Sequence, residues 1–169
     1  YSGGTMKVGF GRPVAIDLDG LKAGSDVLPF LRDHDATDIV GHGTAEIGKR
    51  QIKIAGTASG EGETDGARRV LALASNGFPW QMSVGVEPIK VEAIDAGDSV
   101  VVNGRSVVGP AYVVRAGSLR EVSFVAIGAD GRTSADIAAM FNGGPMNFEE
   151  WVKAKEFDVA TLSDVQRKS

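Results

Sequence analysis

The chain has 169 residues, of which 43% are hydrophobic and 24% are charged, and its net charge is −4. This composition suits one compact domain with a hydrophobic core, and it lacks the basic surface that nucleic-acid binding requires. The absence of cysteine excludes disulfides, thiolate metal sites and a cysteine nucleophile. No apolar run approaches the roughly 20 residues of a membrane-spanning helix. We therefore expect a globular protein that binds neither nucleic acid nor membrane.

The first third of the chain predicts short β-strands. Apolar runs bounded by glycine or polar residues place them at residues 6–10, 13–18, 27–31, 44–47 and 51–57. In the last of these runs Ile52 and Ile54 alternate with Lys53, which is the pattern of a half-buried strand.

A helix is expected next, ending at Ser75. Thr64 or Asp65 can serve as its N-cap, and apolar residues then recur at helical spacing. Asn76 and Gly77 supply the stop, because glycine readily takes the left-handed conformation that follows a helix.

The chain from residue 81 to residue 127 again favours strands, at 81–86, 89–94, 99–102, 106–115 and 120–127. Turn signals at Gly97, Asn103-Gly104 and Gly117 separate them. Asn103-Gly104 lies between two valine-rich runs, which strongly indicates a two-residue hairpin.

Composition changes after Ala129. A short helix is predicted over residues 133–140, followed by the glycine-rich junction Asn142-Gly143-Gly144-Pro145 and helical patterns at 148–157 and 161–167. We expect one main domain at residues 1–141, of mainly-β α+β class, and a helical appendage or the start of another module at 142–169. The chain opens Tyr-Ser-Gly-Gly without an initiator Met, so we expect a piece of a longer protein.

The chain contains two histidines, so few side chains can act as acid or base near neutral pH. His34 follows an apolar run and lies between two aspartates, whereas His42 lies between two glycines. By local pattern alone, each is a surface histidine in a polar loop or turn.

Ser83 is the serine with the most informative surroundings. Strand alternation places Gln81, Ser83 and Gly85 on one face, and Gly85 would allow the backbone to approach a bound carbonyl closely. Many β-proteins carry a serine and a glycine on one strand face, so this pattern does not by itself indicate catalysis.

Glu121 lies in another predicted strand, and alternation predicts that Leu119, Glu121 and Ser123 share a face. A carboxylate there is suited to orienting an imidazole and stabilising its protonated form. The simpler interpretation is a rim carboxylate paired with Arg115 or Arg120.

Together these segments resemble the prohead proteases of tailed phages, which belong with the herpesvirus assemblins. The resemblance runs from about Pro13 to Asp136 and rests on Leu-Arg-Asp-His34-Asp, Ser83-Val-Gly and Leu-Arg-Glu121-Val-Ser-Phe-Val. It implies that His34 is the general base, Ser83 the nucleophile and Glu121 the acid that completes the site.

The resemblance also implies an assemblin-like β-barrel of short, mostly antiparallel strands with a few flanking helices. The implied activity is a serine endopeptidase that cuts scaffold and major capsid protein precursors, and also itself. The implied location is the host bacterial cytoplasm, inside the assembling prohead. Homo-oligomerisation is left open.

The chain departs from the family in three places. Assemblins use a second histidine after the serine, but no histidine follows Ser83, so a carboxylate must replace it; Asp98 and Glu92 are alternatives to Glu121. His42 stands where prohead proteases commonly have a basic residue, and we expect it to contact substrate. Residues 99–116 resemble an inserted hairpin that can remodel one wall of the substrate cleft.

Backbone N–H groups near Val84 and Gly85 are the candidates for stabilising an oxyanion. No cofactor or metal is expected, since the histidines are poorly spaced for zinc and Asp17-Leu18-Asp19-Gly20 lacks the later ligands of a calcium loop. Two other functions stay open. One is a non-catalytic capsid-assembly or docking module, and the other is a small esterase, although the Gly-x-Ser-x-Gly elbow is missing.

Overall fold

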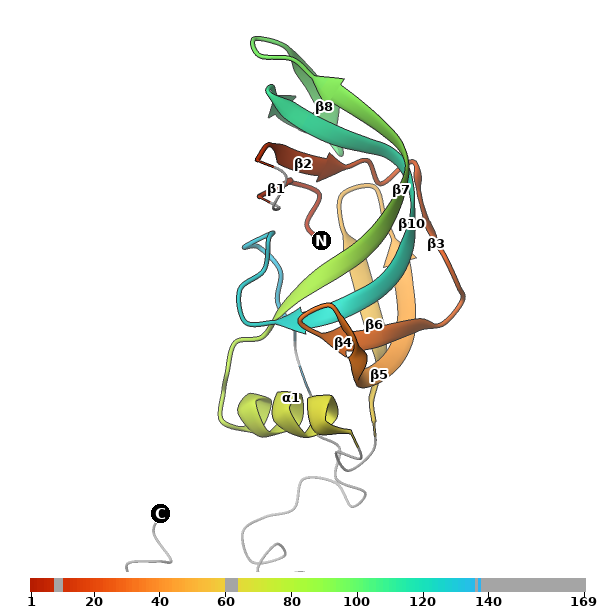
Figure 1. Cartoon of the computed structure of the whole chain (residues 1–169), viewed down its shortest axis with the longest axis vertical. Coiled ribbons are helices and arrows are strands. Elements are labelled where there is room, and N and C mark those ends of the chain that lie inside the picture. Colours follow the sequence, from red (N-terminus) through yellow and green to blue (C-terminus); the bar gives the residue numbers. More distant parts are fainter. Residues whose placement is uncertain (8–10, 60–63, 136, 138–169) are drawn as a thin grey trace, which may run out of the picture. The chain divides into compact units, whose positions relative to one another are not determined.

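The computed structural model describes residues 1–7, 11–59, 64–135 and 137. These residues belong to one compact unit, Tyr1–Ile137 (Figure 1). The predicted boundary at residues 142–145 and the helical patterns beyond it lie outside the described residues. No helix among the described residues is long and apolar enough to cross a membrane.

The described elements are mostly β-strands. In chain order they are β1 Thr5–Lys7, β2 Pro13–Ile16, β3 Leu21–Ala23, β4 Leu28–Arg32, β5 Asp35–Ile47, β6 Ile52–Ala58, α1 Asp65–Ser75, β7 Gln81–Ile94, β8 Ser99–Val102, β9 Arg105–Val108 and β10 Ala111–Val125. The expected mainly-β, α+β class is therefore confirmed.

Strand β10 is the centre of the larger sheet. It pairs antiparallel with β7 and parallel with β2, β3 and β4 in turn, so the sheet is mixed. The hydrogen-bonded path runs β1-β2-β10-β4-β5-β6, and among the described residues β1 and β6 do not pair as strands, although the Ile52 N–H donates to the Tyr1 carbonyl at 3.0 Å. A closed barrel is therefore not confirmed.

Several strands are longer than the sequence predicted. The turn expected at Gly117 was wrong, because Gly117 lies inside β10, opposite Pro88 of β7. The glycine here permits close packing and does not form a turn, because a Cβ at Gly117 would lie 2.9 Å from Val86 Cγ1. Three register shifts in the β7–β10 pair absorb the irregularities that the prediction treated as strand ends.

The helix prediction is confirmed at both ends. The Thr64 hydroxyl caps the N-terminus by accepting a hydrogen bond from the Ala67 N–H, and Gly77 after the C-cap has φ 78°. Trp80 Nε1 donates to the Val70 carbonyl oxygen at 3.1 Å, which ties the segment after the helix back to it. The helix predicted over residues 133–140 is absent at 133–135 and 137, where the backbone is irregular.

The main core gathers buried side chains from most strands of the larger sheet, from the N-terminal segment and from Val70 of α1. Its buried side chains include the aromatic series Phe30, Phe124 and Trp80, in which neighbouring rings pack edge to face at 6.3 Å. This packing fixes β4 against β10 and fixes both to the segment that enters β7. The core thus holds together the three strands that carry the candidate site.

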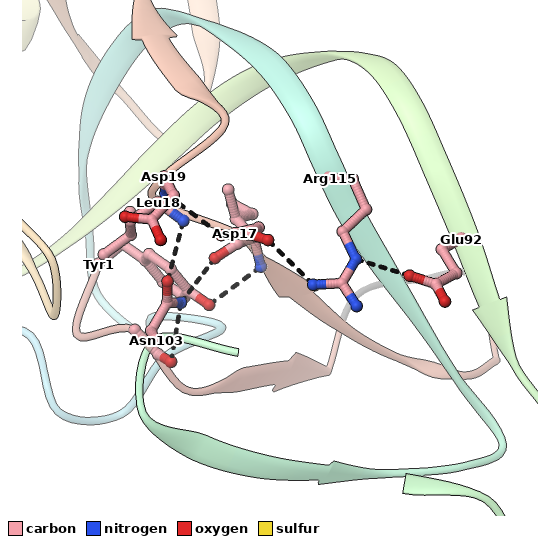
Figure 2. Close-up of polar contacts among 9 residues, drawn as sticks. Tyr1, Asp17, Leu18, Asp19, Glu92, Asn103 and Arg115 are labelled. Atoms are coloured by element: carbon pink, nitrogen blue, oxygen red, sulfur yellow. Dashed lines mark hydrogen bonds and ion pairs between the residues drawn. The ribbon is translucent and has the colours of Figure 1, made fainter. Parts of the chain in front are cut away.

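The β8–β9 hairpin forms a second, smaller core at the opposite end of the β7–β10 ribbon (Figure 1). Its turn is Asn103-Gly104, as predicted, with φ values of 54° and 74°. The Asn103 amide nitrogen donates to the carbonyls of Gly3 and Ile16, and its oxygen accepts from the Leu18 N–H (Figure 2). One side chain therefore fastens the hairpin to the N-terminal segments.

Charged and phenolic groups strengthen the same end of the molecule. Arg115 donates to Glu92 at 2.6 Å and to Asp17 at 2.9 Å, and these partners, Glu92 foremost, raise the pKa of Arg115 (Figure 2). The buried Tyr1 hydroxyl accepts from the Ile16 N–H, and burial raises the pKa of Tyr1 to about 12.

Candidate active site

His34 lies on the two-residue turn that joins β4 to β5. Arg32 pairs with Asp35, and the two residues between them have positive φ, 53° at Asp33 and 62° at His34. This is the backbone of a type I′ hairpin, which favours Asn-Gly or Asp-Gly. Asp33 suits its position, whereas His34 stands where glycine is preferred and costs roughly 1–2 kcal/mol there. Backbone strain of this kind commonly marks a functional position.

Two hydrogen bonds from the main chain hold this turn against β10. The Asp33 N–H donates to the Phe124 carbonyl at 3.0 Å, and the His34 N–H donates to the Ser123 hydroxyl at 3.1 Å. The imidazole is thereby directed across β10 towards β7.

Ser83 and Glu121 reach the same face of the sheet from neighbouring strands. In the antiparallel β7–β10 register Ser83 is opposite Ser123 and Gly85 is opposite Glu121. The predicted alternation of β7 fits the structure, because Met82, Val84 and Val86 pack against the core on the other face.

The predicted face of β10 was wrong at one residue. Leu119 is fully buried in the core with Val122, whereas Glu121 points to the opposite face. A register shift between Leu119 and Glu121 inserts one extra residue opposite the Val86–Gly85 step. The bulge reverses the alternation, which a strict period of two cannot anticipate.

The three candidate catalytic side chains form a continuous hydrogen-bonded chain. His34 Nε2 lies 2.9 Å from Ser83 Oγ, and His34 Nδ1 lies 2.7 Å from Glu121 Oε1. An ionised carboxylate only accepts hydrogen bonds, so Nδ1 carries the proton in this pair. Nε2 is then left with a lone pair directed at the serine hydroxyl, as a general base requires.

Accessibility differs along this chain in a useful way. The His34 side chain is 45% exposed, whereas that of Glu121 is 14% exposed. The carboxylate is therefore sheltered beneath the imidazole, while the imidazole and the neighbouring Ser83 remain open to an incoming molecule. This is the arrangement in which a carboxylate orients a base without reacting itself.

A fourth residue, Ser123, belongs to the same network. Its hydroxyl donates to Glu121 Oε2 at 2.6 Å and accepts from the His34 N–H, and the residue is fully buried. Sequence reasoning placed Ser123 on the face of Glu121 but gave it no role. Its position two residues after the acid, on the same face of one strand, was the available signal.

Gly85 has a different role from the one that the sequence suggested. A Cβ at this position would lie 2.1 Å from Glu121 Oε1 and 2.8 Å from Glu121 Cδ. The missing side chain makes room for the Glu121 carboxylate to lie over Gly85 of β7, where it meets the His34 ring. Close approach to a bound carbonyl is not needed to explain the glycine.

Backbone direction separates the two candidates for an oxyanion donor. The Met82 N–H donates to Thr133 Oγ1, and the Phe124 carbonyl opposite it accepts from Asp33, so neither group faces the other strand of the β7–β10 pair. Alternation then directs the Val84 N–H away from β10 as well, and the Gly85 N–H towards β10. Val84 remains available for an oxyanion, whereas Gly85 does not.

The remaining sequence candidates lie elsewhere. His42 is an exposed residue of β5, between Pro29 and Thr57. Glu92 pairs with Arg115, so it is not a third member of the site. Asp98 follows β7, and its carbonyl accepts from the Gly109 N–H. Neither carboxylate contacts His34 in the described structure.

The hairpin at 99–116 does not line the site, contrary to the expectation. Ser83 pairs with Ser123 near one end of the β7–β10 ribbon, whereas the hairpin leaves from Ile94 and Ala111 at the other end. Among the described residues no group of three potential ligands is placed to hold a metal ion. The site is therefore built from Ser83, His34, Glu121 and Ser123.

Comparison with known protein families, curated proteins and solved structures gives no match for this chain.

Proposed function

We propose that this chain is a serine endopeptidase in which Ser83 is the nucleophile, His34 the general base and Glu121 the orienting acid. The observation that carries the proposal is the unbroken chain of contacts from Ser83 Oγ through His34 to Glu121, at 2.9 and 2.7 Å. Its members come from three strands or turns that are far apart in the sequence.

The proposed reaction proceeds through an acyl-enzyme. His34 Nε2 takes the hydroxyl proton as Ser83 Oγ attacks a peptide carbonyl, and the Val84 N–H stabilises the resulting oxyanion. The imidazolium then donates this proton to the leaving amine, and the C–N bond breaks. Water, deprotonated by His34, releases the acyl group and restores the serine. Throughout, Glu121 stabilises the protonated imidazole.

The outer edge of β7 from Val84 onward supplies a place for an extended substrate. Among the described residues β7 pairs only with β10, and the Val84 N–H points away from β10. The start of this edge is occupied, because the Met82 N–H donates to Thr133 Oγ1. A peptide lying along this edge could pair with β7 through main-chain hydrogen bonds. Its carbonyl would then lie close to Ser83.

The biological role follows from the motif resemblance. We propose that the substrates are phage scaffold and major capsid protein precursors, and that the protease also cleaves itself. The proposed location is the interior of the assembling prohead in the bacterial host, where a homo-oligomer can form. An assemblin-like β-barrel is likewise proposed as the fold of the domain at residues 1–141. High local concentration in the shell would compensate for weak affinity.

A fluorophosphonate probe tests the catalytic proposal, since it labels activated serines. We expect rapid labelling of the wild-type chain at Ser83 and none in Ser83→Ala, whereas Ser106→Ala, at an exposed position of β9, should label normally. Peptide mass spectrometry would locate the label. A wild-type chain that stays unlabelled, or a label that persists in Ser83→Ala, would overturn the proposal.

Substrate class needs a separate experiment. Co-expression with scaffold and capsid precursors should give cleaved products only when Ser83 is present, and mass spectrometry of the chain itself should show new termini. Intact precursors in the presence of a chain that labels normally would retain the serine-enzyme proposal and reject the capsid-maturation role.

A further inference from the structure

Ser123 is one of two polar residues buried among those described, and its exposed fraction is 0%. Burying a hydroxyl is costly unless its hydrogen bonds are made. Its neighbours on β10, Val122 and Phe124, belong to the apolar core, but Ser123 faces the candidate site. An alanine here would fit the space and avoid the cost, so the hydroxyl needs a specific explanation.

The Ser123 hydroxyl hydrogen-bonds both to the Glu121 carboxylate and to the main chain of the His34 turn. The hydroxyl proton goes to Glu121 Oε2, and an oxygen lone pair receives the His34 N–H. Glu121 Oε1 meanwhile accepts from the His34 ring. The base is thus fixed through its main chain and its side chain, with Ser123 and Glu121 closing the loop.

Each of the two hydrogen bonds of Ser123 restricts a different movement in the site. The bond to Oε2 prevents the carboxylate from rotating away from His34, in the space that Gly85 leaves open. The bond from the His34 N–H helps to hold a turn with positive φ at two non-glycine residues. Loss of the hydroxyl would release both the acid and the turn that carries the base.

We propose that Ser123 is a positioning residue, which sets the Glu121 carboxylate and the His34 turn in reactive alignment without contacting substrate. This proposal rests on the proposed serine-hydrolase function of Ser83. In this proposal the buried hydroxyl holds the Glu121 carboxylate and the His34 turn in place at the same time.

The kinetic test compares Ser123→Ala with a matched control, Val113→Ala. Val113 is equally buried on β10 but belongs to the second core, away from the site. We expect Ser123→Ala to lower the rate of fluorophosphonate labelling roughly 10- to 100-fold, because small displacements of reacting groups have effects of this size. Val113→Ala should lower thermal stability without this kinetic loss. Equal labelling in both variants would overturn the proposal.

A spectroscopic test does not depend on activity. The His34 Nδ1 proton, held by Glu121, should give a downfield resonance in the wild-type chain, and the resonance should shift or disappear in Ser123→Ala while the amide spectrum remains folded. An unchanged resonance would overturn the positioning role. If the wild-type chain shows this resonance but takes no label, the serine-hydrolase proposal fails while the resonance still decides the role of Ser123.

Should Ser123→Ala not fold, Ser123→Cys gives a second test. Its thiol fills similar space but is a weaker donor and acceptor than a hydroxyl. We expect slower labelling than in the wild-type chain and a shifted His34 resonance. Wild-type values for both would contradict the proposal.

Discussion

Two hairpin turns of this protein have the same backbone form but different side chains. Both Asn103-Gly104 and Asp33-His34 have positive φ at their two central residues. The first uses the residue pair that this turn prefers, and the second places His34 where the turn prefers glycine. The residues of the Asn103-Gly104 turn are explained by the turn itself, whereas His34 in the other turn needs a different explanation.

The side chains of the two turns make contacts of different kinds. Asn103 bonds only to main-chain groups, and all three of these bonds join the hairpin to N-terminal segments. The His34 ring bonds to two side chains, a hydroxyl and a carboxylate, and remains 45% exposed. A structural turn satisfies backbone groups, whereas the His34 turn presents a base to a nucleophile.

Replacing the two central residues of the His34 turn should have the largest effect on the labelling of Ser83. Asp33→Asn combined with His34→Gly should relieve the strain and keep the fold, because Asn-Gly is the preferred pair for this turn. Labelling of Ser83 by fluorophosphonate should fall by about 10²- to 10⁴-fold, since the general base is removed. Thermal unfolding measures the first effect and labelling rate the second. Retained labelling would show that His34 is dispensable.

Filling the space at Gly85 should have a smaller effect on the same rate. A Cβ there meets Glu121 Oε1 at 2.1 Å, so Gly85→Ala must displace the carboxylate from His34. We expect labelling to slow about 10²-fold, as small misplacements in an active site commonly do. Gly97→Ala is the control, since no atom lies within 4 Å of a Cβ there, although its φ of 95° makes the substitution strained. Labelling of Gly85→Ala at the wild-type rate would contradict the assigned position of Glu121.

Removing the Asn103 side chain from the other turn should lower stability without changing the rate of Ser83 labelling. Asn103→Gly keeps a residue that tolerates positive φ but removes all three side-chain hydrogen bonds. We expect the free energy of unfolding to fall by about 1–3 kcal/mol, the usual effect of unpaired polar groups. Chemical denaturation measures this change. A slower labelling rate in the folded variant would show that the two ends of the ribbon are coupled.

Local patterns predicted the parts of the fold that depend on local rules. The Thr64 cap, the stop at Gly77 and the Asn103-Gly104 hairpin are confirmed because a few neighbouring residues decide each of them. The strands β7 and β10 were predicted as shorter pieces, and their continuity was missed because their irregularities are absorbed by pairing with each other. Register shifts of this kind depend on the partner strand and not on the sequence of one strand.

The site shows the same limit. Motifs indicated Ser83, His34 and Glu121, and the structure brings these three together. Two features depend on contacts across strands: the space that Gly85 leaves for Glu121 and the two hydrogen bonds of the Ser123 hydroxyl. The spacing of Ser123 from Glu121 places both on one face of β10, but it does not predict the contact with the His34 N–H.

The most direct test of the central claim is a double-mutant cycle on the rate of Ser83 labelling. It compares the wild-type chain with His34→Ala, Glu121→Gln and the combined variant. Because Glu121 is assigned to act through His34, its substitution should slow labelling in the wild-type background and have little further effect once His34 is removed. Equal effects of Glu121→Gln in both backgrounds would contradict a linked Ser83–His34–Glu121 site.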